Sequence, residues 1–224
     1  MPKLVICNWK MNGDIDLVSQ FVEKIDDKNV VIALPNVFIA YVRCKFAKFK
    51  VSAQDCSIHD NTGPYTGEIS AKMLSTLGVE YVIIGHSERR KNFFTDSAEN
   101  VYNKIHNVVK NGMIAVLCVD DNYETLIDEK TKGLLKDNVK QVILAYEPMQ
   151  SIGTGVVPKT SEISQTLLKL KEKYFVQKTI YGGSVNSSNV NNILAERDVD
   201  GVLVGGASLN LPELQSILQC NNMV

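Results

Sequence analysis

The residues best suited to chemistry in this sequence are a glutamate, a histidine and a lysine, each at the end of an apolar run. Glu147 ends QVILAYE, His86 follows EYVIIG, and Lys10 follows LVICNW, which contains Asn8. A carboxylate can remove a proton from carbon, while an imidazole and an ammonium group stabilise negative charge that develops on oxygen. This combination favours proton abstraction next to a carbonyl group and requires no metal and no cofactor.

Glycine-rich turns follow two other apolar runs. Gly182, Gly183 and Ser184 come after KTIY, and Gly205 and Gly206 come after DGVLV. Backbone N–H groups in such turns can hold an anion without basic side chains. Each feature has a plainer reading, since glycine pairs also make tight connections and a histidine can be purely structural. Their coincidence at the ends of apolar runs favours a site for a phosphorylated substrate.

The elements that must position these residues are eight short apolar runs separated by stretches of helical period. Continuous apolar runs are typical of parallel strands that are buried on both faces. Eight strand–helix alternations within 224 residues favour a single (β/α)8 barrel over a doubly wound open sheet, with one domain over residues 1–224. Such a barrel brings the strand ends to one rim. Strands are expected at 4–9, 30–34, 49–53, 80–85, 113–119, 141–147, 178–183 and 200–206, and helices at 16–26, 97–110, 160–174 and 210–219.

Net charge, apolar runs and cysteine content limit the kinds of partner and location expected for this chain. A net charge of −1 gives no general attraction for nucleic acid or for an anionic membrane. The sequence has no apolar run of membrane-spanning length and no signal-peptide layout at its start. Five cysteines without a CxxC pair favour neither a disulfide framework nor a zinc site, so a reducing, cytoplasmic location is expected.

Six motifs resemble the signature segments of the triosephosphate isomerase family and occur in the same order along the chain. GHSERR and AYEPxxxIGTG together are highly specific, and the resemblance spans essentially the whole chain. It implies a TIM barrel, with shortened outer helices that account for the compact length. The implied reaction interconverts dihydroxyacetone phosphate and D-glyceraldehyde 3-phosphate by proton transfer through an enediolate. The motifs are NWKMN (8–12), YTGEIS (65–70), GHSERR (85–90), AYEPxxxIGTG (145–155), YGGSV (181–185) and LVGGASL (203–209).

The resemblance also implies roles for individual residues. Glu147 matches the family's base, and His86 matches its neutral electrophile at a helix N-terminus, as is known for this family. Lys10 and Asn8 match residues that hold the substrate, with Glu88 beside the lysine. Residues 148–155 resemble a lid that closes over the substrate. The remaining implied positions are the neighbouring Ser87, the phosphate-binding N–H groups of Gly153, Ser184, Gly205 and Gly206, and the apolar pair Ile152 and Leu203 that presses on the base.

The polar segment 54–68 resembles the loop through which members of this family form homodimers. Thr66 would lie near its tip, and Glu68 would pair with Arg89 across the interface. Met11 would lie near the pocket that receives the neighbour's loop. A two-fold homodimer acting on small phosphorylated trioses is therefore implied.

Two departures from the family pattern leave alternatives open. The lid has Gln150 where the family usually has tryptophan, and Asp120-Asp121 replaces a usual glycine–glutamate pair. One alternative is a barrel retained as a scaffold or binding protein, with turnover impaired by the altered lid. Another is a different barrel enzyme acting on a phosphorylated sugar, although the motifs at Glu147 and His86 do not favour it.

Overall fold

Eight parallel strands close into a barrel in the computed structural model, which describes residues 2–60, 62–93, 95–151 and 154–223. Each strand pairs with the next one along the chain, and β1 pairs with β8, for example Val5 with Val202. The predicted (β/α)8 barrel is confirmed. The strands are β1 (Leu4–Asn8), β2 (Val30–Leu34), β3 (Lys50–Ala53), β4 (Tyr81–Ile84), β5 (Ile114–Val119), β6 (Val142–Tyr146), β7 (Lys178–Tyr181) and β8 (Gly201–Val204).

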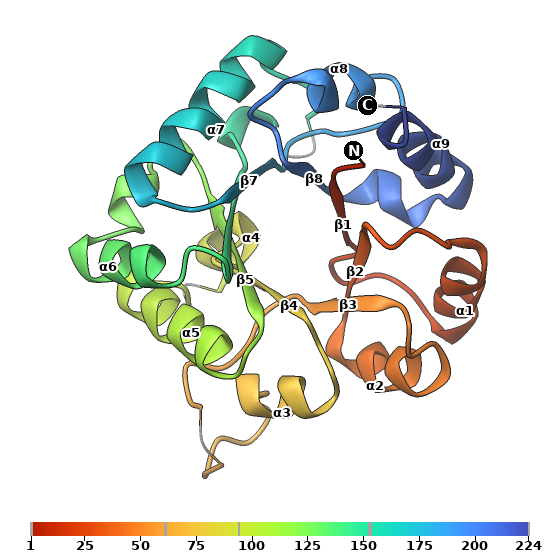
Figure 1. The fold of residues 1–224 in the computed structure, drawn as a ribbon. Helices are drawn as coiled ribbons and strands as arrows, with labels where there is room; N and C mark the ends of the chain where they lie inside the picture. Colours follow the sequence, from red (N-terminus) through yellow and green to blue (C-terminus); the bar gives the residue numbers. More distant parts are fainter. Residues whose placement is uncertain (1, 61, 94, 152–153, 224) are drawn as a thin grey trace.

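Helices surround the barrel as an outer ring, and the two ends of the chain meet beside β1 (Figure 1). The backbone N–H of Lys3 donates to the Asn221 side chain at 2.9 Å, which ties the first strand to the last helix. Three of the described helices have only six residues. The helices are α1 (Ile15–Lys24), α2 (Asn36–Lys45), α3 (Ala71–Thr76), α4 (Ser87–Asn92), α5 (Ala98–Lys110), α6 (Glu129–Asp137), α7 (Thr160–Tyr174), α8 (Val190–Ala195) and α9 (Leu211–Asn221), with short 3-10 helices η1 (Tyr123–Thr125), η2 (Met149–Ser151) and η3 (Gly206–Leu209).

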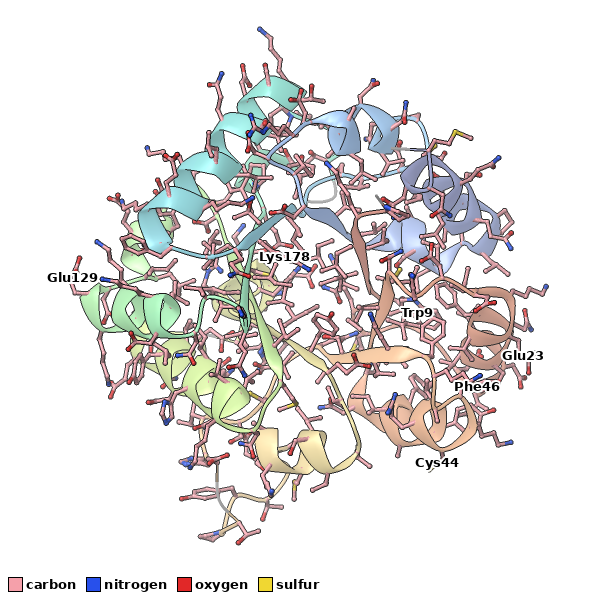
Figure 2. The ribbon with its side chains drawn as sticks, viewed as in Figure 1. Trp9, Glu23, Cys44, Phe46, Glu129 and Lys178 are labelled. Atoms are coloured by element: carbon pink, nitrogen blue, oxygen red, sulfur yellow. The ribbon has the colours of Figure 1, made fainter. Side chains whose placement is uncertain are left out.

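Two apolar layers hold the structure together. The inner cluster consists of alternate strand residues, such as Ile6, Val116 and Ala145, so it fills the barrel interior. The larger cluster packs the other strand faces against the helices, and there Trp9 meets Phe21 edge-on at 5.0 Å. Figure 2 shows Trp9 within this layer, whereas charged side chains such as Glu23 lie on the outside.

Five of the eight predicted strands, those for β1, β4, β6, β7 and β8, are too long by one or two residues at their carboxyl ends, whereas β2, β3 and β5 end as predicted. The expectation of 178–183, for example, becomes Lys178–Tyr181, because the glycines that follow leave the ladder and turn across the rim. The helix expected from residue 210 is capped as predicted. The Asn210 side chain accepts from the Glu213 N–H, and Pro212 lies in the first turn.

The segment expected as a projecting loop does leave the barrel outline, between β3 and α3 (Figure 1). Helix α5 holds its base. Lys104 Nζ lies 2.8 Å from Asp55 Oδ1, and the Asn107 side chain donates to the Ile58 carbonyl at 2.9 Å. None of the helices in the described part of the chain is long and apolar enough to cross a bilayer.

Candidate active site

One cavity of about 300 Å³ at the carboxyl ends of the strands gathers most of the predicted site residues. Its walls come from loops after five of the eight strands, so the sequence-distant motifs meet as expected. Among the described residues, no cluster of three or more His, Cys, Asp or Glu is placed to hold a metal ion. The predicted residues that line the cavity are Asn8, Lys10, His86, Glu147, Ser184, Leu203, Gly205 and Gly206.

Lys10 enters this cavity from an uncommon backbone conformation. Its φ is +53°, in the left-handed region that a non-glycine residue adopts only when surrounding contacts enforce it. The Asn8 side chain accepts from the Lys10 N–H at 3.1 Å, and the Gln54 amide donates to the Lys10 carbonyl at 2.9 Å. The ammonium group forms an ion pair with Glu88, as the family resemblance implied. These contacts direct the lysine across the rim of the barrel.

His86 is held by the turn that joins β4 to α4. Gly85 has φ +69°, which a side chain would strain, and an added Cβ there would lie 3.3 Å from Leu117. His86 then caps α4, with its Nδ1 accepting from the Glu88 N–H at 3.2 Å. Ser87, the first residue of the helix, is buried beside it. Because Nδ1 is an acceptor, a neutral ring carries its proton on Nε2.

Glu147 faces His86 directly, with 3.2 Å between Glu147 Oε1 and His86 Nε2. Burial opposes a charged imidazole, but the carboxylates of Glu147 and Glu88 outweigh it and raise the pKa of His86 above its usual value. Glu147 is itself buried, and its backbone N–H donates to the Val119 carbonyl at 2.8 Å. Its second oxygen, Oε2, has no hydrogen-bond partner among the described residues. That oxygen is available to take up a proton.

The glutamate lies so close to the loop after β7 that only glycine fits there. A Cβ at Gly182 would lie 2.8 Å from Glu147 Cγ and 3.4 Å from Leu203 Cβ. Leu203 is the predicted apolar neighbour of the base, and it is buried in the cavity wall. Its predicted partner Ile152 lies outside the described residues.

Glycine backbone forms the opposite wall, at the loops after β7 and β8. Gly206 begins η3, and a Cβ built on it would meet no atom within 4 Å, so it borders open space. Ser184 Oγ donates to the Ser151 carbonyl at 2.6 Å and accepts from the Gly155 N–H at 3.1 Å, which ties the lid segment to this wall. Gly153, predicted as a phosphate contact, lies outside the described residues.

Cys118 packs under this site rather than taking part in it. Its side chain is fully buried on β5, and burial together with the nearby Glu147 carboxylate raises the pKa of its thiol well above the usual value. A thiol held in its neutral form is a poor nucleophile. All five cysteines are free, as expected for a chain without a disulfide framework.

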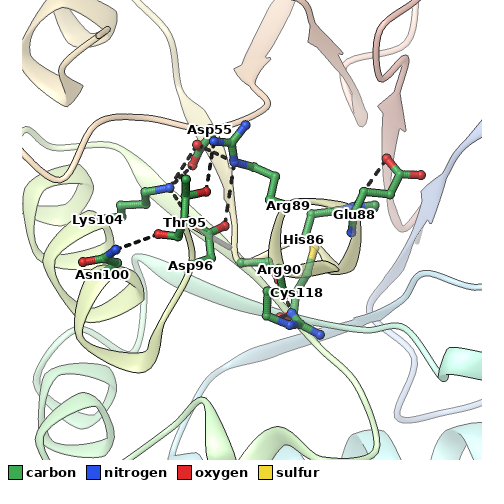
Figure 3. Close-up of polar contacts among 11 residues, drawn as sticks. Asp55, His86, Glu88, Arg89, Arg90, Thr95, Asp96, Asn100, Lys104 and Cys118 are labelled. Carbon is green, nitrogen blue, oxygen red and sulfur yellow. Dashed lines mark hydrogen bonds and ion pairs between the residues drawn. The ribbon is translucent and has the colours of Figure 1, made fainter. Parts of the chain in front are cut away.

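Three predicted interface residues lie in a different place. Thr66, Glu68 and Arg89 line a separate cavity of about 800 Å³ between the projecting loop and α5. Within the chain Arg89 pairs with Asp55, with 2.6 Å between Nε and Oδ2, and Asp96 lies behind it (Figure 3). The pairing of Arg89 with Glu68 across an interface stays a prediction.

Sequence reasoning missed two kinds of residue here. Asn186 lines the cavity one position beyond YGGSV, and nothing in its type marked it. Gly182 was noted as part of a glycine turn, but its packing against Glu147 emerges only from the three-dimensional arrangement. A glycine pair directly after an apolar run is the signal that could have indicated close approach of another backbone or side chain.

Comparisons with known proteins agree with this geometry. The family model described as triosephosphate isomerase matches residues 3–221. The chain is 36% identical to the triosephosphate isomerase of Mycoplasma mobile, over 97% of this chain and 99% of that protein. It is 37% identical to the triosephosphate isomerase of Mesomycoplasma hyopneumoniae (strain 232), over 97% of this chain and 99% of that protein. It is 34% identical to the triosephosphate isomerase of Orientia tsutsugamushi (strain Boryong), over 98% of each chain. The chain belongs to the triosephosphate isomerase family.

Proposed function

We propose that this chain interconverts dihydroxyacetone phosphate and D-glyceraldehyde 3-phosphate, with Glu147 as the base and His86 as the electrophile. Membership of the triosephosphate isomerase family supports this reaction. The observation that carries the residue assignment is the direct approach of the two buried side chains, at 3.2 Å, in a cavity walled by glycine backbone. A base and a proton donor on one small cavity suit the movement of a proton between adjacent carbons.

In this proposal Glu147 removes a proton from one substrate carbon and returns it to the neighbouring carbon. The neutral His86 ring, with its proton on Nε2, donates to the substrate oxygen as charge develops there. The hydrogen bond from the Glu88 N–H to Nδ1 supports this tautomer. The Lys10 ammonium group lies on the same cavity and stabilises the enediolate and the phosphate, with Asn8 helping to place it.

The phosphate group would bind to backbone N–H groups rather than to a cluster of basic side chains. Ser184, Gly205 and Gly206 line the cavity on the side opposite β4, and Gly153 is the fourth group that we propose. Glycines at these positions allow an anion to approach the backbone closely. The open space beyond Gly206 is where a phosphate would fit.

The lid supports an active enzyme more than a retained scaffold. Its contacts with Ser184 use the carbonyl of Ser151 and the N–H of Gly155, and the Gln150 side chain is exposed. The departure at residue 150 therefore leaves the lid-to-wall contacts intact. We propose that closure excludes water, strengthens the electrostatic interactions and prevents loss of phosphate from the enediolate.

We also propose that the enzyme acts as a homodimer formed through the loop 54–68. Tyr65, an exposed apolar side chain of this loop, lines the cavity between the loop and α5, and a partner copy would cover it. Met11, which is 95% exposed, is of a size to enter that cavity in a second copy, where it would lie beside Thr66 and Glu68. The exposed Phe93 ring lies beside Arg89, which also lines this cavity, at 5.4 Å from its guanidinium carbon. The cytoplasmic location stays a prediction.

An assay of D-glyceraldehyde 3-phosphate conversion, coupled to reduction of the ketone product, tests the reaction and the roles together. Shortening the base in Glu147→Asp should lower kcat by roughly 10²-fold or more, since the carboxylate no longer reaches the substrate carbon. Gly206→Val should instead raise KM, because its side chain would occupy the phosphate space.

Two results would contradict this proposal. Wild-type protein without turnover of either triose phosphate would refute the reaction. Unchanged kcat in Glu147→Asp, with wild-type activity present, would refute the base assignment alone. Gln219→Ala, an exposed position on α9 away from the cavity, serves as the matched control and should leave both constants unchanged.

A further inference from the structure

The Arg90 side chain on α4 extends toward β5 and donates hydrogen bonds to three oxygen atoms. Its Nη1 donates to the Gly85 carbonyl and, at 3.2 Å, to the Cys118 carbonyl. Its Nη2 lies 2.5 Å from Asp120 Oδ2, in an ion pair whose side chains are 18% and 13% exposed. Figure 3 shows Arg90 beside Cys118, apart from the group formed by Arg89 and Asp55. A guanidinium group suits this task because its planar donors bind several acceptors at once.

The Gly85 carbonyl belongs to the peptide bond that joins Gly85 to His86. Holding this carbonyl therefore holds the backbone from which the His86 ring projects. Helix α4 has only six residues and cannot be stable by itself, so its place depends on contacts with the rest of the barrel. Arg90 provides such a contact on the β5 side, directly behind His86.

The Asp120 carboxylate is also held by the backbone of its own loop. Its Oδ1 accepts from the Asn122 N–H at 2.8 Å, while Oδ2 binds Arg90, so both carboxylate oxygens have partners. The next residue, Asp121, accepts from the Tyr146 hydroxyl at 2.6 Å. Tyr146 directly precedes Glu147, whose N–H donates to the Val119 carbonyl.

The end of β5 and the residue after it thus lead to both proposed catalytic residues. Asp120 binds Arg90, which donates to the Gly85 carbonyl before His86, and the Val119 carbonyl accepts from the Glu147 N–H. Strand β5 lies between β4, which leads to His86, and β6, which leads to Glu147. We propose that Asp120 is a positioning residue: through Arg90 it fixes the peptide before His86 and so sets the His86 ring against Glu147. Asp120 stands where the family pattern has glycine, and glycine could not make this ion pair.

The inference rests on the proposed function only for the role of His86, and its test has a readout independent of turnover. The variants are Asp120→Ala, Asp120→Asn, which keeps an acceptor but no charge, and Arg90→Lys, which keeps the charge but cannot reach all three oxygens. The control is Glu124→Ala, which removes the exposed Glu124–Lys173 pair a few residues along the same segment. For each full-length protein, kcat and KM are measured separately, and the ¹⁵N shifts of the His86 ring are recorded.

Misplacement of the ring should lower kcat roughly 10-fold to 100-fold in Asp120→Ala and Arg90→Lys, with KM changed by less than about twofold. The kcat of Asp120→Asn should lie between those of these variants and wild type. This variant allows the test to be made even if Asp120→Ala fails to fold. The ¹⁵N shifts of His86 should move in the same order, because its bond from the Glu88 N–H changes. The control should alter neither kcat nor the shifts.

Unchanged kcat and unchanged His86 shifts in Asp120→Ala and Arg90→Lys, even with a lower Tm, would overturn the inference. The inference would also be overturned if kcat fell no further in Asp120→Ala and Arg90→Lys than in the control Glu124→Ala. If wild-type protein failed to isomerise triose phosphates but the His86 shifts still moved, the reaction would be refuted and the positioning role would stand.

Discussion

At the scale of single residues, this site depends on opposing influences on His86. The Glu88 N–H donates to Nδ1 and so favours the neutral ring, while nearby carboxylates favour the charged ring and raise its pKa. A raised folded-state pKa means that protonated His86 stabilises the fold. This stabilisation is fully present below the unfolded value of about 6.5 and is lost as the pH rises through the folded value. In the proposed mechanism the neutral ring is the reactive form, so the pH ranges that favour stability and activity should differ.

The influence of Glu147 on His86 can be measured directly. Glu147→Gln removes the carboxylate that contributes most to raising the pKa of His86, while Glu88 remains. The midpoint of His86 titration, followed by NMR of the ring, should therefore move to lower pH. A midpoint that stays in place or rises would show that Glu147 does not govern the charge of His86.

A second consequence concerns activity at acidic pH. Since the neutral ring is the proposed electrophile and its pKa is raised, kcat/KM of the free enzyme should fall on the acidic side with a midpoint above about 6.5. A pH profile of kcat/KM in the coupled assay tests this. A midpoint well below 6.5 would contradict the raised value or the role of His86.

At the scale of elements, several helices around the barrel are short, and the strand ends still meet at one cavity. Helices α3, α4 and α8 have six residues each, yet β4, β6, β7 and β8 still bring their loops to the same cavity. The barrel ladder sets where each strand ends, whereas helix length sets only the outer surface. Helices α3 and α4 have side-chain caps, from Ser70 and His86, whereas α8 has none and depends on contacts with the rest of the barrel.

Helix α9 offers a test of such a cap. Asn210→Ala removes the side-chain acceptor of the Glu213 N–H and should lower the free energy of unfolding by about 1 kcal/mol. Urea denaturation measures this change, with Gln219→Ala on the same helix as the control. Because Asn210 does not line the cavity, kcat should remain at the wild-type value. A fall in kcat with unchanged stability would mean that α9 acts on the site rather than on the fold.

At the scale of the whole molecule, the projecting loop is ordered at its base and presents apolar groups beyond it. Lys104, Asn107 and Lys110 of α5 all bind the loop, and His59 stacks on Tyr65 at 3.7 Å within it. A loop held in this way loses little conformational freedom on binding a partner. In the proposed dimer a second copy would cover exposed side chains such as Tyr65 of the loop and Phe93 beside Arg89.

Thr66→Arg tests the proposed dimer. A long charged side chain beside the cavity of the loop should be buried against the partner without compensation, and the dimer should dissociate. Sedimentation velocity should then show a species of half the wild-type mass. The control is Lys72→Arg, which keeps the positive charge of an exposed residue on α3. An unchanged sedimentation profile for Thr66→Arg would place the interface elsewhere or exclude it.

The sequence by itself determined the barrel and the residues on its rim. Eight buried runs with helical stretches between them can be satisfied by a closed parallel sheet, and the strand ends then meet at one edge. Glu147, His86 and Lys10 could be named because their residue types follow those runs, and because the motifs around them resemble one family.

Only the tertiary structure decided how these residues are held. That Gly182 touches Glu147, that Arg89 pairs with Asp55 within the chain, and that Asp120 reaches Arg90 are contacts between residues far apart in sequence. Residue type and spacing do not determine such contacts, because they depend on the register of neighbouring strands and on the direction in which each loop leaves the barrel. The residue types proposed for catalysis can therefore be read from the sequence, whereas the distances between them depend on the closed sheet.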